Sequence, residues 1–251
     1  MVKIIDCHSH FPLVTNGDDS FLAELQRCGI EKIFANTVSG NQWHELSTWA
    51  ANKPQIIPFY GIHPWHISAA TLSADLQELA VLLGRSHACC GEIGLDRLCH
   101  TDFALQKEVF RRQLELAAET GTFVAIHCVK SWGPLLEMLT PFRGRITFMV
   151  HSFQGSQEVM ERVVGLGGMI SFSHRLLHGA SGKSRQVVTA TPLHHLLLET
   201  DFPFQKKDQA DSARTYCRVL LRLYTLVSQL RRLPLAELAQ AIKQNGTLCT
   251  H

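Results

Sequence analysis

The sequence predicts an α/β fold, a single (β/α)8 TIM barrel that spans residues 1–251. Eight short apolar runs alternate with longer amphipathic runs along the 251 residues. Each strand–helix pair then has about 31 residues, the usual size of a βαβ repeat. Polar residues also follow most of the apolar runs, as they do where barrel strands end. A doubly wound open sheet alternates in the same way and is the competing architecture.

The expected strands come first, because they are nearly continuous in apolar residues, as strands covered on both faces are. They are residues 2–8, 32–38, 56–63, 88–95, 123–128, 146–152, 168–173 and 195–201. Between them, apolar residues recur at helical spacing in four longer segments, 103–121, 131–139, 156–167 and 212–230. Gly121 offers a C-terminal stop for the first of these helices.

Composition and charge restrict the function only weakly. A net charge of +2 and a pI near 8.2 neither support nor exclude a nucleic-acid substrate. The eight cysteines lack the paired spacing of a disulfide framework or a zinc knuckle, and the N-terminus lacks signal-peptide character. No apolar stretch is long enough to cross a bilayer. These features predict a reduced, cytoplasmic protein without a membrane partner.

Ionisable side chains lie at the ends of six of the eight expected strands. In a barrel these ends converge on one face, where a buried charge or imidazole is costly unless it is paired or ligated. A single histidine at a strand end is usually a hydrogen-bonded surface residue, but six placements on one face favour a site. The residues are His8, His10, His63, Glu92, His127, His151 and Asp201.

Imidazole and carboxylate groups suit Zn²⁺ and Mn²⁺, and carboxylates suit Mg²⁺. The set exceeds what one catalytic ion needs and fits two ions about 3.5–4 Å apart with one bridging carboxylate. No lysine occurs between Lys53 and Lys107, so a bridge from the fourth strand must be Glu92 rather than a carboxylated lysine.

Six motifs in chain order resemble the TatD family of metal-dependent deoxyribonucleases. They are DCHSH at 6–10, GIHP at 61–64, GEIGLD at 91–96, IHC at 126–128, VHSFQGS at 150–156 and ETDFP at 199–203. The resemblance implies a TIM barrel of the amidohydrolase type, two divalent metal ions (Mg, Zn or Mn) and hydrolysis of DNA phosphodiester bonds.

The resemblance also implies a role for each matching residue. His8 and His10 would bind the first metal, Glu92 would bridge both metals, and two later histidines, His127 and His151, would bind the second. Asp201 would be a ligand of the first metal and the catalytic base beside the attacking water. His63 would contact the scissile phosphate.

Further residues are expected around this centre. Asp96 is expected to orient a ligand histidine, and Asp6 to lie one layer deeper than His8. Trp65 could stack on a base. Cations in the presumed active-site loops could form a phosphate-binding rim: Lys130, Arg175, Lys183, Arg185, Lys206 and Lys207.

Two departures from the family pattern leave the substrate open. Phe202 precedes Pro203 in a short loop, and Asn245 is followed by GTLCTH. The first hypothesis is therefore a monomeric, water-activating deoxyribonuclease with DNA as its partner. The alternative is a binuclear hydrolase of a small-molecule ester, phosphotriester, lactone or cyclic amide. A non-catalytic metal-binding protein is disfavoured, because all six expected ligands are present.

Overall fold

The computed structural model describes residues 2–11, 19–85, 87–178, 182–204 and 212–248. Eight parallel strands pair in the order in which they occur in the sequence, which confirms the barrel and rules out the doubly wound sheet. Their bounds are β1 Ile4–Ser9, β2 Ile30–Asn36, β3 Ile56–Tyr60, β4 Cys89–Asp96, β5 Val124–Val129, β6 Phe148–Val150, β7 Met169–Phe172 and β8 Leu196–Leu198.

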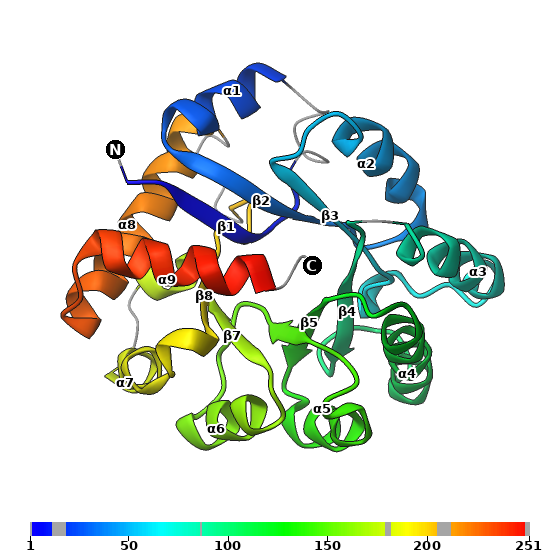
Figure 1. Ribbon diagram of the computed structural model, residues 1–251. Helices are drawn as coiled ribbons and strands as arrows, with labels where there is room; N and C mark the ends of the chain where they lie inside the picture. The colour runs from blue at the N-terminus through cyan, green and yellow to red at the C-terminus, as the bar shows by residue number, and fades with distance from the viewer. Residues whose placement is uncertain (1, 12–18, 86, 179–181, 205–211, 249–251) are drawn as a thin grey trace.

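Helices surround the strands, and each strand up to β8 is followed by a helix before the next strand begins (Figure 1). The helices are α1 Asp19–Arg27, α2 Trp43–Ala50, α3 Leu72–Leu83, α4 Phe103–Thr120, α5 Trp132–Leu139, α6 Gln157–Gly165, α7 Gly182–Ala190, α8 Ala213–Arg231 and α9 Leu235–Leu248. The four helices expected from apolar periodicity are α4, α5, α6 and α8. In the part of the chain that the structure describes, no helix is long and apolar enough to span a membrane.

The last helix, α9, lies across the start of β1 and of β8 (Figure 1). Asn245 donates to the carbonyls of Leu193 and Leu196, each at 2.8 Å. A side chain at Gly246 would meet Ile5 Cδ1 at 2.3 Å, so glycine permits this close approach. The helix therefore covers the end of the barrel opposite the carboxyl ends of the strands.

The barrel closes between its first and last strands through hydrogen bonds just beyond β8. Asp201 N donates to His8 O at 3.0 Å, and His10 N donates to Phe202 O at 2.8 Å. Closure places the ends of β1 and β8 side by side. The strands that fall furthest short of their expected lengths are β3, β6 and β8, which end at Tyr60, Val150 and Leu198. His63 and Asp201 thus lie in the segments after their strands.

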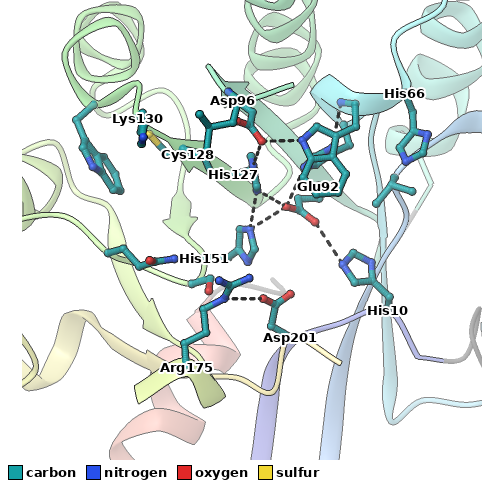
Figure 2. A pocket seen from close by; sticks show the side chains of 18 of the residues that line it. His10, His66, Glu92, Asp96, His127, Cys128, Lys130, His151, Arg175 and Asp201 are labelled. Atoms are coloured by element: carbon teal, nitrogen blue, oxygen red, sulfur yellow. Dashed lines mark hydrogen bonds and ion pairs between the residues drawn. The ribbon is translucent and has the colours of Figure 1, made fainter. Parts of the chain in front are cut away.

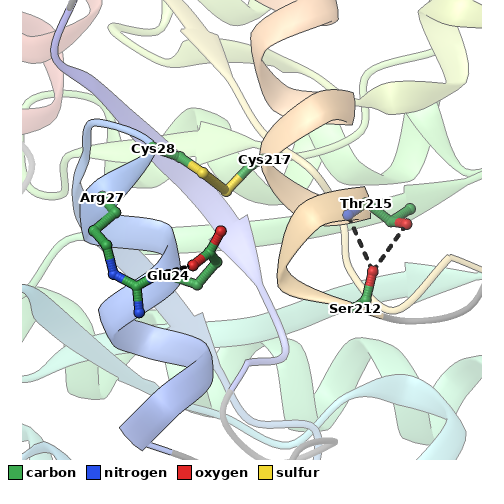
Figure 3. Close-up of a disulfide and its surroundings, with 6 residues drawn as sticks. All are labelled: Glu24, Arg27, Cys28, Ser212, Thr215 and Cys217. Atoms are coloured by element: carbon green, nitrogen blue, oxygen red, sulfur yellow. Dashed lines mark hydrogen bonds and ion pairs between the residues drawn. A yellow bond between two sulfur atoms is a disulfide. The ribbon is translucent and has the colours of Figure 1, made fainter.

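A disulfide connects two helices that lie on either side of this closure (Figure 3). It joins Cys28, directly after α1, to Cys217 of α8, and the two Cα atoms are 6.1 Å apart. The expectation that the cysteines remain unpaired is wrong for these two. Their separation of 189 residues explains why no local spacing pattern indicated the pair.

Candidate metal centre

A pocket of about 770 Å³ opens over the carboxyl ends of the strands. Its lining includes side chains from the ends of β1, β4 and β5 and from the segments after β3, β6 and β8. The barrel therefore brings the sequence-predicted residues to one face. Those that line the pocket are His10, His63, Glu92, His127, His151 and Asp201, with His8 completely buried directly behind them.

Glu92 lies at the middle of the cluster, and its two carboxylate oxygens face different histidines (Figure 2). Oε2 is 3.3 Å from His8 Nε2 and 3.5 Å from His10 Nε2. Oε1 is 2.8 Å from His151 Nε2 and 2.9 Å from His127 Nδ1. This is the arrangement expected of a carboxylate that bridges two ions.

The donor atoms fall into three overlapping groups, each with its ligand atoms within 4.8 Å of one another. Glu92 belongs to two of them, one with His8 and His10 and the other with His63 and His127. The third group contains a carboxylate that sequence reasoning did not select, Glu199. The groups are His8, His10 and Glu92; His63, Glu92 and His127; and His8, His151 and Glu199.

His8 provides the clearest sign that this cluster fits a cation. Its side chain is fully buried, and neither ring nitrogen makes a hydrogen bond to any described residue. A buried imidazole without hydrogen bonds is costly, and a metal ion bound by its ring would remove this cost. The histidine and carboxylate donors around it are those that zinc and manganese prefer.

Backbone contacts orient two of the other histidines. His10 Nδ1 lies 2.9 Å from the carbonyl of Asn36, so a proton on Nδ1 donates to that carbonyl and leaves the lone pair of Nε2, on the side of Glu92, free for a metal ion. In His63 the pattern is reversed, because Nδ1 accepts from Trp65 N at 3.2 Å. The proton of a neutral His63 is then on Nε2, which lies 3.4 Å from Glu92.

Asp96 orients His127, as the sequence predicts for a residue behind a ligand. It is buried, and its Oδ2 lies 3.3 Å from His127 Nε2. The indole Nε1 of Trp65 donates to the same oxygen at 2.6 Å. A carboxylate in this position fixes the ring and raises its basicity.

Glu199 orients His151 in the same way as Asp96 orients His127. Its Oε1 is 3.3 Å from His151 Nδ1 and accepts from Ser152 N at 2.7 Å, while Ser171 donates to its other oxygen. The signal for this residue was present in the sequence. Glu199 lies in the apolar run 195–201, and the reasoning that selected Glu92, a carboxylate inside an apolar strand, applies to it equally.

Asp201 lines the pocket but belongs to none of the three groups. Its Oδ2 lies 4.0 Å from Arg175 Nε, a contact drawn in Figure 2. The backbone at Asp201 is left-handed, with φ of 53°, and its N–H is held by the carbonyl of His8. The side chain is 17% exposed, so it can reach groups inside the pocket.

Electrostatics divides the histidines into two kinds. Burial lowers the pKa of His63 to about 4, against the raising effect of Glu92. Burial would also lower the pKa of His151, but Glu92 and Glu199 hold it well above its ordinary value. Burial alone would raise the pKa of Glu92, yet the surrounding histidines keep it well below its usual range. These shifts favour the ionised form of Glu92, the neutral form of His63 and the protonated form of His151.

Asp6 lies beneath the centre and connects three elements. Its carboxylate accepts from His8 N at 3.2 Å, from Thr200 N at 2.9 Å and from Thr200 Oγ1 at 2.5 Å, and Tyr216 of α8 also donates to it. Burial raises the pKa of Asp6 to about 7, despite these hydrogen bonds. The residue therefore has a structural place one layer below the pocket, as the sequence predicts.

The pocket rim contains part of the expected set of cations. Lys130 and Arg175 line the pocket together with Trp65 and Trp132. Lys183 and Arg185 lie on α7 and do not line it. Lys206 and Lys207 lie outside the described residues.

The chain as a whole is similar to known proteins. The model of the family described as TatD related DNase matches residues 5–249. An uncharacterized metal-dependent hydrolase of Escherichia coli K12, YjjV, is 28% identical and covers 97% of this chain and 96% of its own. The protein of Erwinia billingiae named 3′-5′ ssDNA/RNA exonuclease TatD is 32% identical over 74% of this chain and 73% of its own.

Solved structures agree with this similarity. The crystal structure of the E. coli YjjV protein superimposes with a TM-score of 0.84 and covers 98% of this chain and 97% of its own. A TatD-family hydrolase from Entamoeba histolytica is 18% identical with a TM-score of 0.82, which supports the fold alone.

Proposed function

Because the chain belongs to the TatD-related DNase family of metal-dependent hydrolases, we propose that it hydrolyses phosphodiester bonds of single-stranded nucleic acid, with DNA as its substrate, at a binuclear metal centre. The observation that carries this proposal is the two-sided carboxylate of Glu92. One oxygen faces His8 and His10, and the other faces the histidines of β5 and of the segment after β6. The relative in Erwinia billingiae is named a 3′-5′ ssDNA/RNA exonuclease, which supports a single-stranded substrate.

The residues of this chain that would hold the ions are the six that the sequence predicts, His8, His10, Glu92, His127, His151 and Asp201. Two divalent ions, when bound, would activate water, orient the phosphate and neutralise charge in the transition state. Glu199 adds a carboxylate behind His151 that increases the negative charge around the centre. Elemental analysis of the purified protein distinguishes Mg²⁺, Mn²⁺ and Zn²⁺.

Asp201 would take the proton of the attacking water. It is a partly exposed carboxylate at the pocket wall, and Arg175 is its neighbour in the described structure. A general base must lie within hydrogen-bond reach of the proton that it abstracts. The backbone contact from Asp201 N to His8 O places Asp201 beside a proposed metal ligand, where that water would be bound.

His63 would contact the scissile phosphate. With Nδ1 accepting from Trp65 N, the neutral ring carries its proton on Nε2 and can donate it to a phosphate oxygen. That tautomer suits a hydrogen-bond donor better than a metal ligand, although Nε2 belongs to the second group of ligand atoms. Lys130 and Trp65 would be further substrate contacts at the rim.

A small-molecule ester, phosphotriester, lactone or cyclic amide is the second candidate. The pocket of about 770 Å³ has the size of a small-molecule site, which favours this alternative.

A monomeric state and a cytoplasmic location stay predictions of the sequence. Sedimentation velocity of the purified protein tests the first of these, and fractionation of the source cells tests the second.

The test is cleavage of end-labelled single-stranded DNA by purified protein with added Mg²⁺, Mn²⁺ or Zn²⁺, with EDTA as the blank. We expect metal-dependent cleavage that Glu92→Ala and Asp201→Asn each reduce at least about 100-fold. An RNA and a duplex of the same sequence, and a set of lactones and phosphotriesters, are assayed in parallel. No cleavage of any nucleic acid, or full activity in Glu92→Ala, would overturn the proposal.

A further inference from the structure

Exposed apolar side chains gather at one wall of the pocket. Among the described residues, four large hydrophobic side chains are exposed: Trp65 at 56%, Val81 at 64%, Leu98 at 64% and Leu221 at 47%. Trp65 and Leu98 both line the pocket, whereas Val81 and Leu221 lie on α3 and α8. Exposed apolar surface concentrated at a cavity indicates contact with a ligand.

One buried carboxylate holds both of these residues. Asp96 Oδ2 accepts from the indole Nε1 of Trp65 at 2.6 Å, and Asp96 Oδ1 accepts from the backbone N of Leu98 at 2.7 Å. The indole also packs against the His63 ring in a T-shaped arrangement, with 5.1 Å between ring centroids and an angle of 89°. Trp65 is thus exposed and yet held in one orientation, which reduces the entropy lost when a flat ligand stacks on it.

The same carboxylate contacts the metal centre, since Asp96 Oδ2 also lies 3.3 Å from His127 Nε2. The side chain of Asp96 therefore fixes the position of Trp65 and Leu98 relative to His127. Other parts of the pocket lining are cationic, with Lys130 after β5 and Arg175 after β7. This pocket would fit a ligand that has an aromatic ring next to an anionic diester. The ring would lie against Trp65 and Leu98, and the diester would lie near the proposed metal centre and the two cations.

We infer that Trp65 and Leu98 form a stacking platform for the nucleobase next to the scissile phosphate, and that Asp96 fixes this platform relative to His127. This inference rests on the proposed function and specifies its substrate. A base that lies on the platform has left its own helical stack, so it must be unpaired. The enzyme would then act on single strands or frayed ends and would discriminate against an abasic nucleotide at that position.

Substitutions at Trp65 separate its two roles. Trp65→Ala removes the ring and the hydrogen bond to Asp96, while Trp65→Phe keeps a ring for stacking and removes only the hydrogen bond. Leu98→Ser reduces the apolar area. Val81→Ser is the matched control, because it removes an equally exposed apolar side chain on α3.

Cleavage is measured as kcat/KM on single-stranded oligonucleotides that carry either a normal base or a tetrahydrofuran abasic residue on each side of the cleaved bond in turn. We expect Trp65→Ala to lower kcat/KM about 10-fold on the base-bearing substrate and to leave the abasic substrate nearly unchanged. Trp65→Phe should retain most of the preference for a base, Leu98→Ser should lose part of it, and Val81→Ser should match wild type. An equal loss on both substrates, or no loss, would overturn the inference.

A binding measurement without catalysis keeps this inference separate from the proposed function. In EDTA, we expect a base-bearing oligonucleotide to quench tryptophan fluorescence of the wild type more than that of Trp65→Phe, and the abasic oligonucleotide to quench both equally. If no oligonucleotide is cleaved but this difference is seen, the platform stands and the proposed reaction fails. If cleavage occurs and the difference is missing, the platform is wrong and the reaction stands.

Discussion

At the scale of single residues, charge balance around Glu92 explains most of the centre. The carboxylate is buried among histidines, and its burial is tolerated because positive charge surrounds it. Glu92 and Glu199 raise the pKa of His151 and so favour a proton on its ring, and the pKa of His127 beside Glu92 is raised as well. A metal ion at the same position would replace this proton. Metal binding and proton release are therefore coupled.

This coupling predicts that metal loading releases protons at pH 7 and that apparent metal affinity increases with pH. The sign follows because the raised pKa of His151 keeps its ring protonated at neutral pH, whereas a ligand histidine must be neutral. Isothermal titration calorimetry in two buffers of different ionisation enthalpy measures the number of protons released. Identical binding enthalpies in both buffers would contradict the prediction.

Glu199→Gln should weaken metal binding about 10- to 100-fold, the usual effect of losing a carboxylate behind a ligand histidine. The amide keeps the shape of the side chain but removes the charge that acts on His151 Nδ1. Competition with a chelating dye measures the affinity. Glu158→Gln, an exposed glutamate at the start of α6, is the control and should bind metal as wild type does.

At the scale of elements, the closure between β1 and β8 depends on α8. Tyr216 points inward and donates to Asp6, which in turn holds His8 N and Thr200 N. The next residue, Cys217, is bonded to Cys28 at the end of α1. One segment of α8 therefore secures the place where the ligands of the first and last strands meet.

Tyr216→Phe should lower the free energy of unfolding by about 1.5–3 kcal/mol, because it removes a hydrogen bond to a buried carboxyl group. Chemical denaturation with and without metal measures the loss. Tyr224→Phe is the matched control, since its hydroxyl is also buried but contacts only neutral backbone groups: it donates to Ile5 O at 2.8 Å and accepts from Ile5 N at 3.4 Å. Its loss should be about 0.5–1.5 kcal/mol. An equal loss in the two variants would argue against a special role for Asp6.

Cys217→Ser should lower the free energy of unfolding by about 2–4 kcal/mol under non-reducing conditions, because the disulfide restricts the unfolded chain. Reduction of the wild-type protein should cause the same loss, and reduction of the variant should cause no further loss. Alkylation of the denatured, unreduced protein followed by mass spectrometry checks the bond itself. Labelling of both Cys28 and Cys217 in that experiment would show that the bond is not formed.

At the scale of the whole molecule, the strands are the part of the fold that the sequence predicts best. Strands buried on both faces appear as apolar runs, and each of the eight expected runs overlaps an observed strand. The patterns delimit the helices less completely: α1, α2, α3, α7 and α9 are not separately identified by apolar periodicity. Short helices with few buried positions carry a weak periodic signal.

The site follows from the strand ends, with informative exceptions. Glu199 lies inside an apolar run, two positions before the more conspicuous Asp201 at its end, so reasoning from strand ends does not select it. The link from Trp65 to Asp96 joins residues 31 positions apart, and the disulfide joins residues 189 apart. Contacts at such separations depend on the closed barrel and are not visible in local patterns.

Metal stoichiometry tests the central claim, a two-metal centre bridged by Glu92, most directly. Purified protein is loaded with Zn²⁺ or Mn²⁺, freed of excess metal by gel filtration and measured by elemental analysis beside Glu92→Ala. The account predicts about two equivalents of metal in the wild-type protein and at most one in the variant. A single equivalent in the wild type, or two equivalents retained by Glu92→Ala, would contradict it.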